Sequence, residues 1–180
     1  MHISMVALNV TDSYDQHQAI WALFPGPAER KRDHLFRVEN SAHNQVTILL
    51  QSTSEPQSHQ AAQVLQSKPF KPTINNGDYY KFKLSANPTK CLSQGKKVIE
   101  IKEEAEQVAW LQRKLSGANV TITSIESTLV SSRKTHTSRF VTFEGVLQVT
   151  DAEQVYSALV MGIGRKKHAG AGLLSLAKAS

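Results

Sequence analysis

The chain has 180 residues, of which 40% are hydrophobic and 20% are charged. This length and composition exclude a fibrous or intrinsically disordered protein and suit one globular domain or two small ones. The formal net charge is +6. Residues 1–88 contain 8 Lys and Arg against 7 Asp and Glu, and residues 89–180 contain 13 against 8. A basic half attracts polyanions, although the charge alone favours a well-solvated surface slightly.

The cysteine and terminal patterns bear on location. The single cysteine, Cys91, cannot form an internal disulfide, which predicts a reducing, cytoplasmic setting. The N-terminal sequence MHISMVALNVTDSYD lacks the apolar stretch of a signal peptide. No segment approaches the roughly 18 consecutive apolar residues of a membrane-spanning helix. No His, Asp, Glu or Cys cluster has metal-ligand spacing, so we expect no metal, no cofactor and no membrane.

The first half alternates between strand and helix patterns. Asp12 can cap the first helix, which the Pro25-Gly26-Pro27 segment ends. Asn75–Asp78 is a strong turn signal before the last strand. The expected order is strand 2–9, helix from residue 13, strands 34–40 and 45–52, a weak helix at 56–66, and strand 79–86.

The second half repeats this order. Acidic residues open the helix expected at 103–115 and Arg113 and Lys114 end it, as suits the helix dipole; Val108, Leu111 and Leu115 form its apolar stripe. The other expected elements are strand 98–101, strands 120–129 and 139–149, helix 151–161 and strand 173–176. Two βαββαβ halves predict an α+β chain of two tandem ferredoxin-like (RRM-like) domains, residues 1–88 and 89–180.

A glycine-rich basic segment, GIGRKKHAGAG, spans residues 162–172. Glycines let backbone amides approach a phosphate closely, and cations neutralise it. The spacing fits neither Walker A nor the dinucleotide fingerprint. A flexible loop with solvated lysines is the alternative, but regular glycines followed by LLSLA favour a phosphate-binding loop. The candidate phosphate-binding residues, and hence the candidate contacts to a nucleic acid, are Gly162, Gly164, Arg165, Lys166, His168, Gly170 and Gly172.

Tyr14 and His17 lie three residues apart on the first expected helix, so they share a face. His17, Ile20, Trp21 and Phe24 follow the i, i+3, i+4, i+7 pattern, which places His17 on the apolar stripe. A histidine there is more often a hydrogen-bonded core residue than a catalyst. Spacing alone therefore leaves both roles open.

Two further segments could contact RNA. Residues 131–139, SSRKTHTSR, carry Arg133, Lys134 and Arg139 without an acid. A basic hairpin tip suits the phosphates of an RNA duplex, and a disordered loop is the alternative. Tyr79, Tyr80 and Phe82 could stack on bases, but strand alternation assigns part of them to the core.

Five sequence blocks cover much of the chain: HQAIWALFP (17–25), KLSANPTK (83–90), EAEQVAWLQRKL (104–115), FEGVLQVTDA (143–152) and GIGRKKHAGAGLLSLA (162–177). These blocks resemble, in order, those of the CasE family, the CRISPR RNA-processing endoribonuclease subunit of type I-E Cascade complexes. The strand blocks HLFRVE (34–39) and ILLQS (48–52) agree with the same family.

The resemblance implies two ferredoxin-like domains and metal-independent cleavage of precursor CRISPR RNA at the 3′ base of the repeat hairpin. The substrate's 2′-hydroxyl would attack the adjacent phosphate, leaving a 2′,3′-cyclic phosphate and a 5′-hydroxyl. The enzyme would then stay bound to the hairpin as a Cascade subunit, beside the backbone subunit nearest the 3′ end of the crRNA.

The resemblance also assigns catalytic roles. His17 falls on the family's catalytic histidine, as general base or general acid. Tyr14 matches the active-site tyrosine, and Lys167 a lysine of the glycine-rich loop that could stabilise charge on the scissile phosphate. A non-catalytic scaffold that only holds the RNA hairpin is the alternative function, and the presence of both Tyr14 and His17 favours the nuclease. A general RNA-binding module is disfavoured, because no aromatic glycine-rich strand of the RNA-recognition type is present.

Overall fold

The computed structural model describes residues 1–10, 12–27, 31–42, 44–132 and 136–179. The chain forms two compact units. The first unit comprises residues 1–72, 131–137 and 168–170, and the second unit comprises residues 73–130, 138–167 and 171–180. The principal boundary therefore lies after Pro72, earlier than the division expected after residue 88. Among the described residues, no helix is long and apolar enough to cross a membrane.

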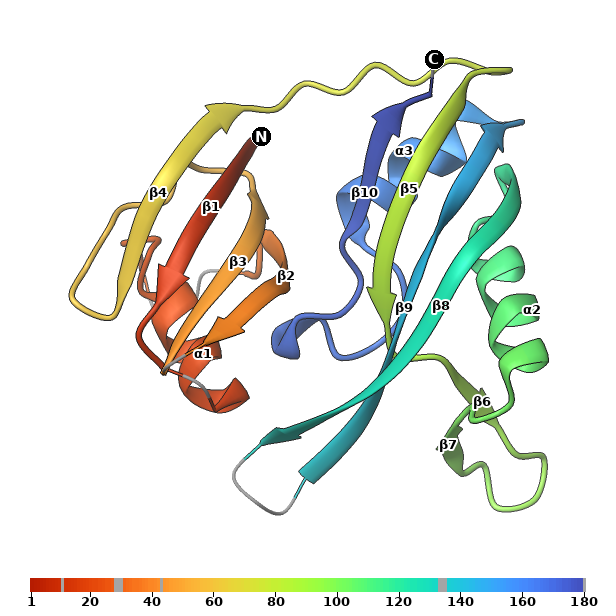
Figure 1. Cartoon of the computed structure of the whole chain (residues 1–180), viewed down its shortest axis with the longest axis horizontal. Coiled ribbons are helices and arrows are strands. Elements are labelled where there is room, and N and C mark those ends of the chain that lie inside the picture. Colours follow the sequence, from red (N-terminus) through yellow and green to blue (C-terminus); the bar gives the residue numbers. More distant parts are fainter. Residues whose placement is uncertain (11, 28–30, 43, 133–135, 180) are drawn as a thin grey trace. The chain divides into compact units, whose positions relative to one another are not determined.

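The second unit has the complete ferredoxin-like topology (Figure 1). Its elements are β5 (Tyr79–Ala86), β6 (Thr89–Cys91), β7 (Val98–Glu100), α2 (Glu104–Lys114), β8 (Ala118–Ser132), β9 (His136–Val149), α3 (Ala152–Met161), the 3-10 turn η1 (Lys167–Ala169) and β10 (Leu174–Lys178). The four-stranded sheet has the order β10-β5-β9-β8, and β6 and β7 form a separate ribbon. Removing that ribbon leaves βαββαβ, which confirms the expected ferredoxin-like fold. The expected first strand, 98–101, is wrong, because β7 lies in the ribbon and β5 takes that place in the sheet.

One apolar core explains why both helices cover the same face of this sheet. On β5, Phe82 and Leu84 are buried, and their partners across the antiparallel ladder are Gly145 and Phe143 of β9. The same core cluster includes Trp110 of α2. Asp151 begins α3 as expected, because its carboxylate accepts hydrogen bonds from the backbone N–H groups of the first turn, at 3.1 and 3.3 Å.

The first unit repeats the strand order but has one helix fewer. Its elements are β1 (His2–Leu8), α1 (Ser13–Trp21), β2 (His34–Ala42), β3 (Gln45–Ser52) and β4 (Ala62–Pro69), and the sheet order is β2-β3-β1-β4. Every described pair of neighbouring strands is antiparallel. The unit is thus ferredoxin-like without a helix between β3 and β4.

The weak helix expected at residues 56–66 is wrong. Residues 62–69 form β4, an edge strand that pairs with β1 alone. Its Leu65 is 62% exposed. The strand therefore lacks the regular alternation of apolar and polar residues by which a strand is recognised in a sequence. Ala, Gln and Leu are good helix formers, and in this segment tertiary pairing overrides that preference.

The assignment of residues 79–86 to the first half is also wrong, because β5 is the first strand of the second unit. Tyr80 and Phe82 belong to the core, 7% and 4% exposed. The hydroxyl of Tyr80 donates to the carbonyl of Thr73 at 3.1 Å. These two side chains therefore pack in the interior, which excludes them as a base-stacking platform.

Candidate active site

Helix α1 presents Tyr14 and His17 at the edge of its buried face. The Asp12 carboxylate caps the helix by accepting the Tyr14 N–H at 2.9 Å, as the sequence predicted. The buried positions of α1 are Ser13, Gln16, Ala19 and Ile20. His17 is only half-buried. The expectation that it lies on the apolar stripe is therefore wrong, because the buried face of the helix passes through its neighbour Gln16 and His17 lies at the edge. Tyr14 is 39% exposed.

His17 belongs to a row of aromatic and imidazole rings within the first unit. Its ring centroid lies 6.0 Å from that of Trp21 and 6.2 Å from that of His168, edge-on. Trp21 in turn lies 5.5 Å from His34, which stacks on Phe24 at 5.4 Å. The buried His34 and Phe24 thus anchor a row whose outer end, His17 and His168, reaches the surface.

The electrostatic surroundings favour the neutral form of His17. Partial burial lowers the pKa of His17, and the nearby positive charge of Arg32 lowers it further. A hydrogen bond from its imidazole to the backbone of His168 opposes the lowering by favouring the charged form. One ring nitrogen is thereby held as a donor to a carbonyl, which leaves the other with a lone pair that can accept a proton.

The glycine-rich segment begins at the end of α3. Gly162 terminates the helix with φ 79°, and its N–H donates to the carbonyl of Ala158 at 2.9 Å. The segment closes on itself, because the Ile163 N–H donates to the Gly172 carbonyl at 2.9 Å. The Gly172 N–H donates to the carbonyl of Ser85 in β5 at 2.8 Å. The loop is therefore tied to the sheet, which argues against a flexible linker.

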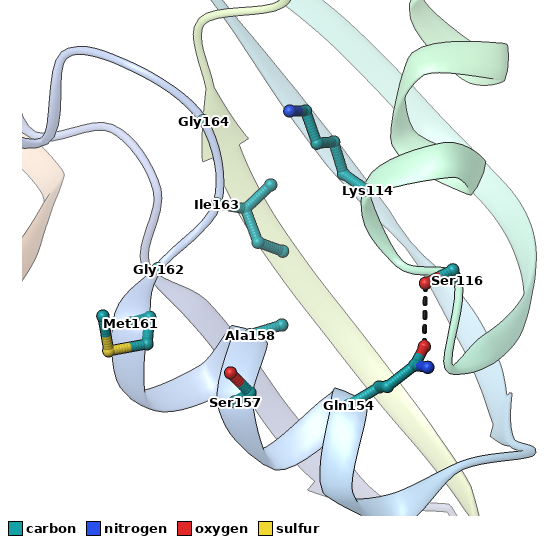
Figure 2. Close-up of a pocket in the computed structure, with 9 residues that line it drawn as sticks. All are labelled: Lys114, Ser116, Gln154, Ser157, Ala158, Met161, Gly162, Ile163 and Gly164. Carbon is teal, nitrogen blue, oxygen red and sulfur yellow. Dashed lines mark hydrogen bonds between the residues drawn. The ribbon is translucent and has the colours of Figure 1, made fainter.

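Figure 2 shows the start of this loop beside the ends of α2 and α3. Ile163 points toward the side of α2, and the Ser116 hydroxyl donates to Gln154 Oε1 at 2.8 Å across the gap. An open pocket of about 340 Å³ lies here, lined by Lys114 and Gly164 among others. A Cβ added at Gly164 would lie 3.1 Å from the Trp110 ring, so close packing as well as backbone conformation requires this glycine.

The turn η1 carries Lys167 and His168. Lys167 is half-buried, and its aliphatic stem lies against Gly172, where an added Cβ would come within 3.2 Å of Lys167 Cγ. Gly170, which belongs to the first unit, has φ +100°, and a Cβ there would lie 3.0 Å from the ring of Phe36. Segment 168–170 therefore packs on β2 of the first unit, which places His168 beside His17.

The remaining predicted RNA-binding residues fall into three groups. Arg165 and Lys166 are exposed, and Lys166 has φ 63°. Arg133 and Lys134 lie outside the described residues. Arg139 is held in β9 of the second unit, where its backbone N–H donates to Glu100 Oε2 at 2.8 Å and its Nε is buried without a hydrogen-bond partner in the described part of the chain. Its contact with RNA stays a prediction.

Sequence reasoning did not assign roles to Arg32, His34 or Phe36. Arg32 is one of three successive basic residues, but Glu29 and Asp33 beside it masked its importance. His34 and Phe36 occupy β2, and their strand pattern indicated only burial. No spacing rule relates them to α1 or to residues 168–170, because their proximity arises from the sheet order.

The first unit supplies a proton acceptor in His17, and the second unit supplies a glycine-rich loop with exposed cations. This combination suits acid–base chemistry at a phosphate: a neutral imidazole accepts a proton, and the glycine-rich loop and its lysines bind negative charge. Among the described residues, no group of three or more His, Cys, Asp or Glu side chains could hold a metal ion.

Comparison with known proteins assigns the chain to a class. Residues 3–178 match the family model described as CRISPR associated protein, so the chain belongs to this family. It is 36% identical to the CRISPR system Cascade subunit CasE of Escherichia coli, covering 92% of each chain. The CRISPR-associated endoribonuclease Cse3 of Thermus thermophilus is 29% identical, with 94% of this chain and 92% of the relative covered.

The fold agrees with a solved relative. The structure of Thermus thermophilus Cse3 bound to an RNA representing a pre-cleavage complex has a TM-score of 0.81 and 29% identity, covering 98% of this chain and all of the other. The family expected from the sequence blocks, the CasE family, is thereby confirmed, as is the tandem ferredoxin-like architecture.

Proposed function

We propose that this protein is an endoribonuclease that binds the hairpin of a CRISPR repeat and cuts the precursor RNA at the 3′ base of that hairpin, without a metal. The observation that carries the proposal is the half-buried His17. Burial and the charge of Arg32 lower its pKa, and its ring is hydrogen-bonded to the backbone of His168 in the glycine-rich segment. Its family includes proteins named as a Cascade subunit and as an endoribonuclease.

The chemistry follows from the properties of His17. Neutral His17 accepts the proton of the 2′-hydroxyl, whose oxygen then attacks the adjacent phosphorus. The bond between phosphorus and the 5′-oxygen breaks, which leaves a 2′,3′-cyclic phosphate and a 5′-hydroxyl. Tyr14, one helical turn before His17, positions the imidazole or the phosphate. Lys167 stabilises the charge that builds on the phosphate oxygens.

RNA binding uses the basic, glycine-rich segment. The exposed Arg165 and Lys166 contact phosphates, and the glycines at 162, 164, 170 and 172 let the backbone approach the RNA. Arg139 of β9, together with Arg133 and Lys134, which precede it in the sequence, contacts phosphates across the groove of the RNA stem. These contacts position the RNA, and His17 cuts it.

The product remains bound. A protein that holds the hairpin after cleavage becomes the subunit of a Cascade complex at that end of the crRNA, in contact with the nearest backbone subunit. We place this assembly in the cytoplasm, where the single Cys91, which is exposed, stays reduced.

The test is incubation of the purified protein with its repeat RNA in EDTA. We expect one cut at the hairpin base and a product that ends in a 2′,3′-cyclic phosphate, identified by mass spectrometry. The control is the same RNA with a single 2′-deoxy nucleotide before the scissile phosphate, which lacks the nucleophile and should bind but stay intact. Cleavage of the deoxy RNA, or a requirement for magnesium, would contradict the mechanism. Tight binding of both RNAs without any cut would favour the scaffold function.

A further inference from the structure

Two imidazoles face each other at the surface of the first unit. The His17 and His168 rings have centroids 6.2 Å apart and meet edge-on at 89°. His17 comes from α1, and His168 comes from η1, far along the chain. Both belong to the first unit. His168 is exposed, and His17 is half-buried, so both residues are accessible from solvent.

Transesterification of RNA requires two proton transfers. The attacking 2′-oxygen loses a proton, and the departing 5′-oxygen gains one, on opposite sides of the same phosphorus. An acid or base must come within about 3 Å of the oxygen it serves. Two rings with centroids 6.2 Å apart can therefore each reach one of the two oxygens.

The structure separates the roles of the two histidines. The backbone of His168 already accepts a hydrogen bond from the His17 ring, so the geometry of the turn fixes which His17 nitrogen is free. The side chain of His168 is not needed for that bond. Histidine is the side chain best suited to hold a transferable proton near neutral pH, so the His168 imidazole suits the second proton transfer.

Close packing against the core of the first unit fixes the position of the turn that carries His168. Gly170, two residues later, has φ +100°, and a Cβ there would lie 3.0 Å from the ring of the buried Phe36. Phe36 is 1% exposed and belongs to the core of the first unit. The position of His168 relative to His17 is thus tied to the same core that supports α1.

We infer that His168 is a second catalytic residue, the general acid that protonates the 5′-oxygen as it leaves, while His17 is the general base. The inference rests on the proposed nuclease function. In the balanced step, the 2′-oxygen forms its bond to phosphorus and gives its proton to His17. The bond from phosphorus to the 5′-oxygen breaks, and that oxygen takes the proton of His168. His17 ends protonated and His168 neutral, and exchange with water restores both.

The test compares two RNAs under single-turnover conditions. One is the normal repeat RNA, and the other carries sulfur in place of the bridging 5′-oxygen at the scissile phosphate. A thiolate leaves without protonation, because a thiol, with a pKa of about 8.5, is far more acidic than the alcohol that leaves from normal RNA. We expect His168→Ala to cut the normal RNA about 10²–10⁴-fold more slowly than wild type and the sulfur RNA at nearly the wild-type rate. His17→Ala should be slow on both.

Each result decides a separate question. Equal slowing of both RNAs by His168→Ala would show that His168 acts by binding or positioning, and an unchanged rate on normal RNA would remove it from the reaction. Rescue of His17→Ala by sulfur, with no rescue of His168→Ala, would reverse the roles and overturn the assignment. If wild type cuts neither RNA, the proposed nuclease function itself fails. Gln57→Ala, an exposed side chain in the first unit, controls for unspecific effects, and RNA-binding titrations show whether each variant still binds.

Discussion

Helices α1 and α2 occupy the same place in the two ferredoxin-like units but differ in which side chains they bury and which they leave at the surface. α2 turns Gln107, Trp110 and Leu111 into the core. Acidic residues lie in its first turn and basic residues in its last, in accord with the helix dipole. α1 is shorter, has no basic residue in its last turn, and leaves His17 and Trp21 half-buried at its edge.

The difference shows how one topology provides both a scaffold and a site. α2 covers its sheet with a tryptophan that is 3% exposed and that supports Gly164 of the glycine-rich segment. α1 uses Trp21 instead to hold one flank of His17, with ring centroids 6.0 Å apart. The second unit's helix thus serves as a scaffold, and the first unit's helix carries the proposed catalytic residues.

Paired tryptophan substitutions test this contrast and have the largest expected effect on stability. Trp110→Ala removes a buried indole and should lower the free energy of unfolding by about 3–5 kcal/mol, measured by urea denaturation. Trp21→Ala removes a half-buried ring and should destabilise less. It should nevertheless slow RNA cleavage, because His17 loses its packing partner. Equal stability losses with unchanged cleavage by Trp21→Ala would contradict the division of roles.

Charge removal in the glycine-rich segment should weaken RNA binding without unfolding the protein. The variant Arg165→Gln, Lys166→Asn, Lys167→Gln keeps a residue that tolerates positive φ at position 166. Loss of up to three phosphate contacts should reduce the slope of log K against log salt by up to about 2–3. The control replaces three other exposed lysines, Lys68, Lys71 and Lys102, by Gln. A slope equal to that of wild type would show that the segment does not contact phosphate.

Arg32→Gln should have the smallest effect, a shift in the pH dependence of cleavage. As general base, His17 acts in its neutral form, so the low-pH limb of the rate profile rises through the pKa of His17. The charge of Arg32 lowers this pKa, and its removal should move the rising limb to higher pH. The other titratable groups beside the ring row, Asp33, His34 and His168, are unchanged in this variant. A limb that stays in place, or moves to lower pH, would contradict the assignment.

Much of the fold could be predicted from local patterns. The caps at Asp12 and Asp151, the β2–β3 hairpin and the α2 helix follow from residue types and spacing. The α2 stripe was predicted only in part, because Val108 is 38% exposed and Trp110 takes its place in the core. The edge strand β4 was missed because Ala, Gln and Leu favour a helix when no strand partner is known.

The site was predictable only residue by residue. The glycines and cations of residues 162–172 indicated a phosphate loop, and Tyr14 and His17 stood on one helix. Spacing could not show that His168 meets His17, because this contact depends on how Gly170 packs on Phe36. Nor could it show the effect of Arg32 on His17, since the two residues lie on different parts of the first unit.

The most direct test of the account compares His17→Ala with the wild type in two assays on the same repeat RNA. The account predicts that cleavage in EDTA falls by at least about 10²–10⁴-fold, while RNA affinity and its salt dependence stay near those of wild type. Loss of cleavage and binding together would show that His17 is structural, and cleavage at the wild-type rate would contradict the central claim that His17 moves the proton.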